Sequence, residues 1–236
     1  VFRPRPIDKA VAEMESIDNN RLFIVDNSLS QDTEWEMALF REMIPLKKKW
    51  CSHPIEDKPE VLDLAARAGA WYVYQAVFDT SDYIRERIKR YHDYGIAVEG
   101  TILLGLDDHT EDGIRRLIDF LMEIVLDLAE FTVLTPFPYT QAYDELMRQN
   151  RIFSFDWDEY SADKVVYPPR HMTPEKLQEL FDYAWDMFYA DQSQEIKMFN
   201  LFQKVVRKEI DDNTYRPRNR RLGKKAFGKA IDPEGP

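Results

Sequence analysis

The sequence holds a single cysteine, and this scarcity excludes several kinds of site. Cys51 cannot form an intrachain disulfide or a cysteine-only metal site. The lack of disulfides fits the cytoplasm, which is the compartment we expect. Cys51 and His53 could supply two metal ligands, but two ligands do not make a site, so a structural role is the simpler interpretation. We predict no metal site within the chain.

Long apolar runs are also missing. No stretch approaches the roughly 20 consecutive apolar residues that a membrane span requires. The segment 1–6 has no apolar run resembling a signal peptide. Because it also lacks an initiator Met, we expect a fragment, a processed chain or an incomplete record.

The chain has no excess of basic residues. The formal net charge is -11 at pH 7, which makes nucleic acid an unlikely partner, because phosphate contacts need a basic surface. The exception is the segment 204–229, with ten Lys and Arg against three Asp and Glu. We predict a basic, flexible tail over 204–236, and a docking arm for an acidic partner is the alternative.

Strand-like apolar runs and helical patterns alternate over most of the chain, as in repeated βα units around a parallel sheet. The expected strands are 22–25, 49–52, 71–78, 96–104 and 131–134. The expected helices are 7–17, 35–44, 59–68, 81–94 with Thr80 as a cap, and one that Thr110 begins. This arrangement suits either an incomplete (βα) barrel or an open doubly wound sheet.

The alternation stops after Tyr139. An aromatic and acidic loop over 156–169 is followed by a long helix from Thr173 to about Phe202. We therefore divide the chain into a partial barrel at 1–150, a loop and helical extension at 151–203, and the tail.

Ligands of parallel α/β proteins bind where the strands end in loops, so polar and glycine residues there are candidates. They are Asp26, Asn27, Ser52, His53, Gln75, Asp79, the segment Gly100–Gly105, and Thr135. Glycines within a strand mark a close approach, either of a ligand such as an adenine ring or of a packed helix. The spacing alone does not separate these two explanations. No Ser-His-Asp set, Walker loop or G-x-G-x-x-G motif is present.

Several separated segments resemble one family. They are FRPRP at 2–6, IVDN at 24–27, IPLKKKW at 44–50, LAARAG at 64–69, GTILLG at 100–105, LTPFPYT at 134–140 and MTPEKLQ at 172–178. In this order they resemble radical S-adenosylmethionine (SAM) enzymes of the class with an N-terminal cobalamin-binding domain. That class includes the anaerobic cyclase of chlorophyll ring formation.

This resemblance implies a partial (βα)6 TIM-type barrel whose first strand and CxxxCxxC cluster loop would precede Val1. It implies SAM and a [4Fe–4S] cluster as cofactors, and cobalamin through a missing N-terminal region or partner subunit. The chemistry would be reductive cleavage of SAM to a 5′-deoxyadenosyl radical, or cobalamin-assisted radical chemistry, on a small-molecule substrate that the sequence does not identify.

The resemblance also assigns residues. Asp26 and Asn27 match the strand end near the methionyl part of SAM. Gly100, Ile102 and Gly105 match the adenine motif, and Leu134 and Thr135 match the last strand. We add Gln75, at the end of the strand 71–78, as a cofactor contact. No catalytic residue is assigned.

Two positions depart from the family pattern. Phe78 stands where the family has a polar SAM contact, and Tyr139 stands where a turn usually has glycine. These departures leave a second hypothesis, a degenerate, non-catalytic barrel that acts as a scaffold or assembly subunit. A third hypothesis is an unrelated (βα) barrel enzyme that uses carboxylates such as Asp26, Asp79 and Asp107.

Overall fold

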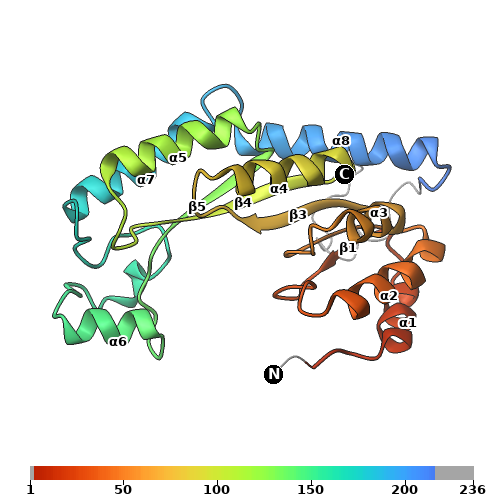
Figure 1. The fold of residues 1–236 in the computed structure, drawn as a ribbon, viewed down its shortest axis with the longest axis horizontal. Helices are drawn as coiled ribbons and strands as arrows, with labels where there is room; N and C mark the ends of the chain where they lie inside the picture. The colour runs from red at the N-terminus through yellow and green to blue at the C-terminus, as the bar shows by residue number, and fades with distance from the viewer. Residues whose placement is uncertain (1–2, 216–236) are drawn as a thin grey trace, which may run out of the picture.

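The strands of the chain form one parallel sheet, seen here in a computed structural model that describes residues 3–215 (Figure 1). The strands are β1 (Arg21–Ile24), β2 (Lys49–Ser52), β3 (Ala70–Ala76), β4 (Ala97–Leu104) and β5 (Leu128–Val133). Their order in the sheet is β1-β2-β3-β4-β5, without a reversal. A doubly wound sheet requires a reversal of strand order, so the sequential order identifies a partial barrel.

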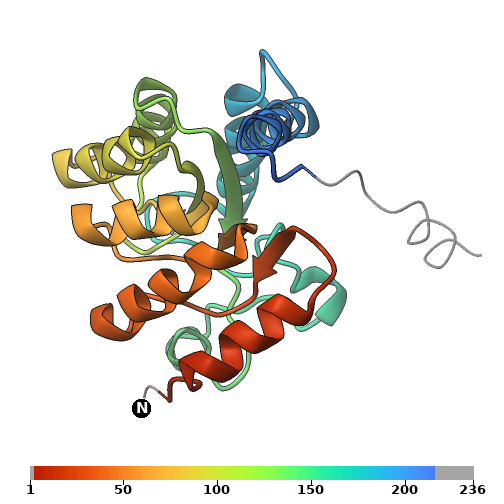
Figure 2. The same ribbon diagram turned by 90° about the vertical axis from the view of Figure 1, so that its right-hand side faces the viewer.

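Helices connect the strands and lie in an arc on one side of them (Figure 2). They are α1 (Ile7–Ser16), α2 (Thr33–Met43), α3 (Pro59–Ala68), α4 (Asp82–Asp93) and α5 (Glu111–Glu123). Side-chain caps begin three of them, because Asp32, Ser81 and Thr110 accept hydrogen bonds from backbone N–H groups of the first turn. The cap of α4 is thus Ser81, one residue after the predicted Thr80.

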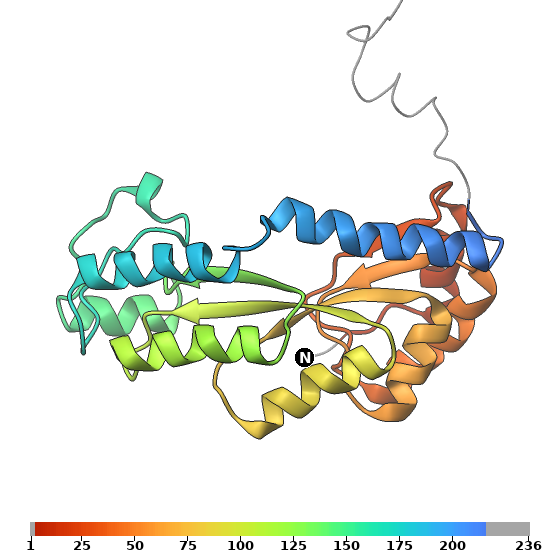
Figure 3. The same cartoon turned by 90° about the horizontal axis from the view of Figure 1, so that it is seen from above.

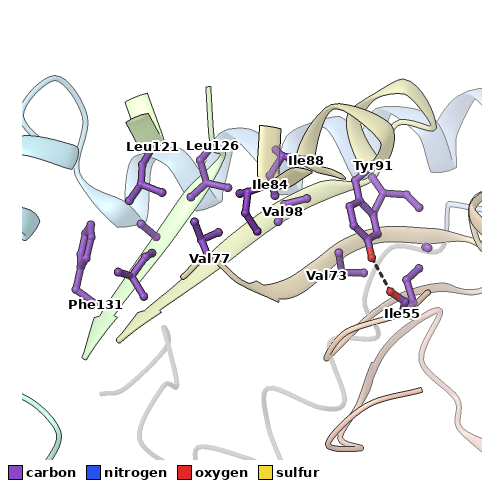
Figure 4. Packing of buried hydrophobic residues seen from close by; sticks show 14 of the residues in the cluster. Ile55, Val73, Val77, Ile84, Ile88, Tyr91, Val98, Leu121, Leu126 and Phe131 are labelled. Carbon is purple, nitrogen blue, oxygen red and sulfur yellow. Dashed lines mark hydrogen bonds between the residues drawn. The ribbon is translucent and has the colours of Figure 1, made fainter. Parts of the chain in front are cut away.

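The core lies between the sheet and this arc of helices (Figure 4). Val73 and Val98 face Ile84 and Ile88 of α4, and all four are buried. Tyr91, also on α4, donates its hydroxyl proton to the Ile55 carbonyl at 2.6 Å. A buried hydroxyl needs a hydrogen-bond partner. The partner here belongs to the loop after β2, so the bond holds this loop against α4.

The other face of the sheet carries the alternate residues of each strand. In the parallel ladders Tyr74 is opposite Glu99, and Thr101 is opposite both Ala76 and Glu130. Since neighbouring residues of a strand point to opposite faces, these side chains share the face away from the arc of helices. We call this face the open face.

The extension comprises α6 (Gln141–Arg148), α7 (Pro174–Phe188) and α8 (Gln194–Asp211). In place of the single long helix expected from Thr173 to about Phe202, α7 ends at Phe188, and α7 and α8 run nearly end to end along the sheet (Figure 3). The predicted boundary at 203/204 is also wrong, because it falls within α8. The rest of the predicted tail, 216–236, lies outside the described residues. No helix within 3–215 is long and apolar enough to cross a membrane.

The helix α8 covers the open face near the amino ends of the strands. Leu201 packs with Tyr72 and Leu128 in a buried cluster. Arg21 pairs with Glu209 at 2.5 Å, and Lys49 pairs with Asp212 at 3.1 Å. The carboxyl ends of the strands are left free of this helix.

The two outer edges of the sheet differ. At β5, the Tyr189 hydroxyl accepts from Ala129 N at 3.0 Å and donates to Ala129 O at 2.7 Å. Tyr189 therefore occupies hydrogen-bonding groups of an edge strand that would otherwise be unpaired. At β1, no strand within the described residues pairs with the outer edge.

Candidate functional site

The candidate site lies at the carboxyl ends of the strands, and four predicted residues lie there. Asp26 and Asn27 follow β1 and are exposed. Leu134, half-buried, follows β5, and its backbone N–H donates to Leu104 O at 2.9 Å. Thr135 is buried and donates its hydroxyl proton to Val133 O at 3.1 Å. The backbone bond places the ends of β4 and β5 side by side.

Gln75 departs from its expected role. It is buried on the helix side of the sheet, where its amide donates to the Ile55 carbonyl and to the Tyr91 hydroxyl. The Gln75 side chain points to the same face of β3 as Val73. This polar residue at the strand end therefore forms its hydrogen bonds within the core. The Gln75 side chain does not reach the open face.

Gly100 and Ile102 also point to the helix side. A Cβ at Gly100 would lie 2.6 Å from Leu126 Cδ2, and Ile102 is buried in the core. At this glycine the packing explanation therefore holds, because Leu126 fills the space. Only the backbone of these two residues borders the open face.

Gly105 is packed against the extension. Its φ of +92° favours glycine, and a Cβ there would lie 2.5 Å from Tyr167 Oη and 2.7 Å from Leu177 Cδ2. Tyr167 also donates its hydroxyl proton to the Gly105 carbonyl. Gly105 thus allows the turn after β4 to pack closely against Tyr167 and Leu177 of the extension.

Three rings line the open face at β1 to β3. The His53 ring stacks on Tyr74 with centroids 5.1 Å apart, and Phe23 lies 6.1 Å from His53 and 6.0 Å from Tyr74. Phe23 is half exposed. This wall offers flat apolar contact area beside the strand ends.

The carboxylates of Glu99 and Glu130 also lie on the open face, and neither was predicted as a site residue. Glu99 is only 5% exposed, yet no hydrogen bond from residues 3–215 reaches its carboxylate. Burial raises the pKa of Glu99 to about 7, and the nearby Glu130 contributes to the same shift. The alternation of the strand 96–104 was the signal for Glu99, since odd positions face away from the helices.

Cys51 lies on the same face. Its thiol donates to Leu22 O at 3.7 Å, and burial raises its pKa to about 11. The thiol therefore stays protonated at neutral pH and is a poor metal ligand. Within residues 3–215 no group of three or more His, Cys, Asp or Glu side chains is placed to hold a metal ion.

A buried carboxylate on α2 supports the loop after β2. Glu36 Oε1 accepts from Glu56 N at 3.2 Å, whereas Oε2 is buried without a partner. Burial is the main cause that raises the pKa of Glu36 to about 7. Glu36 therefore holds the loop that carries Ile55.

One carboxylate of the third hypothesis, that of Asp107, is engaged in ion pairs. Asp107 accepts from Arg151 at 2.6 and 2.9 Å and from Arg170 at 2.7 Å. The hydrogen bond from Arg151 is the main cause that lowers the Asp107 pKa to about 2. An acid this strong, held by two guanidinium groups, is a poor general base. His109 accepts from Gly105 N at 3.3 Å, and burial lowers its pKa, so it stabilises the turn.

Comparisons with known proteins bear on the sequence and the fold. No protein family model matches the chain. It is 28% identical over 203 residues to bacteriochlorophyllide d C-12(1)-methyltransferase of Chlorobaculum tepidum, covering 76% of this chain and 44% of that protein. It is 22% identical over 223 residues to the anaerobic magnesium-protoporphyrin IX monomethyl ester cyclase of Cereibacter sphaeroides, covering 78% and 36%. The chain thus spans less than half the length of these curated relatives.

The fold is also shared with a solved enzyme. The radical SAM methyltransferase TsrM of Kitasatospora setae, with cobalamin and a [4Fe–4S] cluster bound, matches with a TM-score of 0.57 and 18% identity. The match covers 75% of this chain and 41% of that chain. The chain thus shares its fold with a radical SAM methyltransferase, and its sequence is similar to those of a methyltransferase and a cyclase.

The iron–sulfur cluster of radical SAM enzymes does not fit the residues of this chain. One cysteine cannot supply three thiolates, and Cys51 is half-buried and protonated. These residues therefore cannot hold the cluster by themselves, and no step through a cluster follows from this geometry.

The two departures from the radical SAM pattern lie in the loops that follow β3 and β5. Phe78 follows β3 with its side chain 58% exposed, so its ring is available to a ligand or to another protein segment. Tyr139 has a φ of +67°, in the left-handed region, and its side chain is fully exposed. The turn after β5 therefore keeps the backbone conformation of a glycine position while carrying a bulky residue.

Proposed function

We propose that this chain forms the barrel of a radical SAM enzyme of the cobalamin-dependent class, and that its open face binds SAM and a small-molecule substrate. The observation that carries the proposal is the open face itself, where five parallel strands end beside apolar side chains exposed to solvent. Leu103 on β4 is 40% exposed, although its neighbours Ile102 and Leu104 are buried. An exposed apolar floor at strand ends is typical of a ligand site.

The residues fit the adenosyl part of SAM. The side chains of Thr101 and Leu103 form the floor of the proposed site at β4. Gly100 and Ile102 border this floor with their backbone only. The half-buried Leu134 lies at the neighbouring strand end. The exposed Asp26 carries the charge for the methionyl amino group, and Asn27 lies beside it. SAM bound here would supply a 5′-deoxyadenosyl radical that takes a hydrogen atom from the substrate, or a methyl group for cobalamin-assisted chemistry.

Two further cofactors are proposed from the similarity to TsrM. TsrM binds cobalamin and a [4Fe–4S] cluster, and we propose the same pair for the complete enzyme, with all their ligands beyond the described residues. The proposed compartment is the cytoplasm, where a lone protonated thiol such as Cys51 stays reduced.

A ligand-binding experiment tests the open face. Leu103→Trp fills the proposed adenosyl position, so the Kd for S-adenosylhomocysteine should rise at least tenfold by isothermal titration calorimetry. Met122→Trp is the matched control, because Met122 is also 40% exposed but lies on α5. Equal affinity of the two variants, or no binding by the wild-type chain, contradicts the site.

A degenerate barrel is the second candidate, favoured by the exposed Phe78 ring and by the lone cysteine. Its test is anaerobic reconstitution of the protein from the complete reading frame with iron and sulfide. The proposed enzyme shows the charge-transfer absorption of a stoichiometric cluster and consumes SAM. A protein that shows neither the charge-transfer absorption nor the consumption of SAM is a scaffold.

A further inference from the structure

A groove of about 350 Å³ lies at the end of the sheet opposite the proposed SAM site, between α8 and the amino ends of the strands. Its polar lining comes from Lys49, His92, Asp127, Lys204 and Lys208. Trp71, Leu201 and Val205 contribute apolar surface. The volume matches that of a small-molecule site.

The charge of this groove opposes that of the molecule. The whole chain has a formal net charge of -11, yet three lysines line the groove against one carboxylate. That carboxylate is already engaged, because Asp127 Oδ2 lies 2.8 Å from His92 Nε2 and accepts from Val98 N at 2.9 Å. The groove is thus locally positive.

Two of the lysines lack a counter-charge. Lys49 pairs with Asp212 at 3.1 Å, but Lys204 and Lys208 form no ion pair with any residue of 3–215. They are four residues apart on α8, so their ammonium groups lie on one helix face and repel each other. An anion between them would remove this repulsion.

We propose that this groove binds a phosphate ester of nucleotide size. Lysines bind phosphate as point charges, and a phosphate monoester carries about two negative charges at neutral pH, which matches Lys204 and Lys208. The phosphate group would lie between Lys204 and Lys208, and the organic body would lie on Trp71 and Leu201. Such a ligand would join α8 to the sheet and stabilise the covered end of the barrel.

Uridine 5′-monophosphate is a suitable probe, because it lacks the adenine that the proposed SAM site would recognise. We expect the full chain to bind it by isothermal titration calorimetry, to gain thermal stability on binding, and to bind more weakly as NaCl is raised. Uridine should bind at least tenfold more weakly, since it lacks the charge. Inorganic phosphate should also bind at least tenfold more weakly, since it lacks the organic body.

The double variant Lys204→Gln/Lys208→Gln should raise the Kd for uridine 5′-monophosphate at least tenfold, and Lys208→Glu should abolish binding. Lys9→Gln/Lys164→Gln is the control, because it removes the same charge at two exposed positions outside the groove. Circular dichroism confirms that each variant is folded. Equal affinity of the groove variant and the control, or equal binding of uridine, overturns the proposal. S-adenosylhomocysteine affinity should not change in the groove variant, which separates this test from that of the open face.

Discussion

The Tyr167 hydroxyl lies on Gly105 so closely that a Cβ there would be 2.5 Å from the phenol oxygen. The same hydroxyl donates to the Gly105 carbonyl. This contact joins the turn after β4, beside the proposed SAM site, to the segment of the extension between α6 and α7.

Gly105→Ala should therefore destabilise the chain by about 2–4 kcal/mol, through the positive φ and the collision with Tyr167 and Leu177. Gly95→Ala is the matched control. Gly95 has a φ of +72° but nothing within 4 Å of a Cβ, so only the backbone cost of about 1–2 kcal/mol remains. Urea unfolding measures both. Equal losses in the two variants would show that the contact with Tyr167 adds nothing.

The βα alternation was predictable because buried parallel strands and amphipathic helices leave different periods in the sequence. All five strands and the first five helices lie where the apolar runs predicted them, although β5 begins at Leu128 and not at 131. The barrel could not be separated from a doubly wound sheet, because the strand order depends on pairings between distant segments. The break after Phe188 was missed, since α7 and α8 continue one apolar pattern.

The orientation of the site residues could not be predicted from their positions at the strand ends. Asp26 and Asn27 lie at a strand end as expected, whereas the Gln75 side chain serves the core. The difference is one of orientation, because a shift of one residue moves a side chain to the other face of a sheet. The alternation of the strand 96–104 groups Glu99 with the other odd positions, but the sequence does not show which face of the sheet the helices leave open.

Tyr139→Gly should stabilise the chain by about 0.5–1 kcal/mol. The φ of +67° costs a residue with a Cβ about 1–2 kcal/mol, and the added chain entropy of glycine offsets part of this gain. Tyr139 is fully exposed, so its ring loses little packing. Tyr139→Ala is the control and should leave the midpoint of urea unfolding nearly unchanged. A Tyr139→Gly variant less stable than wild type would show that the ring makes a contact of its own.

Glu99 should make stability fall as pH rises. Its pKa in the folded chain is about 7, above the ordinary value of 4.5, so the folded state holds a proton that the unfolded state releases between these values. The stability that this proton contributes is full below about pH 4.5 and lost as pH rises through about 7. Glu99→Gln should therefore be more stable than wild type at pH 8, by about 1–2 kcal/mol.

Glu36 has the same pKa and the same window, so each single Glu→Gln variant should remove only part of the slope. The double variant should lose less stability between pH 5 and 8 than either single variant. Urea unfolding at several pH values measures this. An unchanged slope in Glu99→Gln would mean that the carboxylate is solvated in the folded chain.

Asp107 should act in the opposite direction. Its folded pKa of about 2 lies below the ordinary value of 3.8, so its contribution is present above about pH 3.8 and lost as pH falls towards 2. Asp107→Asn should cost about 1 kcal/mol at pH 7, a value reduced for the partial exposure of the ion pairs. The variant should lose less stability than wild type between pH 4 and 2. Identical acid unfolding curves would contradict the two ion pairs.

The two outer edges of the sheet differ in their ability to pair with a further strand. Tyr189 blocks the outer backbone of β5 at Ala129, whereas Arg21–Ile24 presents a strand edge to which no strand of residues 3–215 is added. Another strand can therefore be appended only beside β1, whether it comes from the same polypeptide or from a neighbour. In concentrated solution, self-association should begin at β1, where the half-exposed Phe23 adds exposed apolar surface.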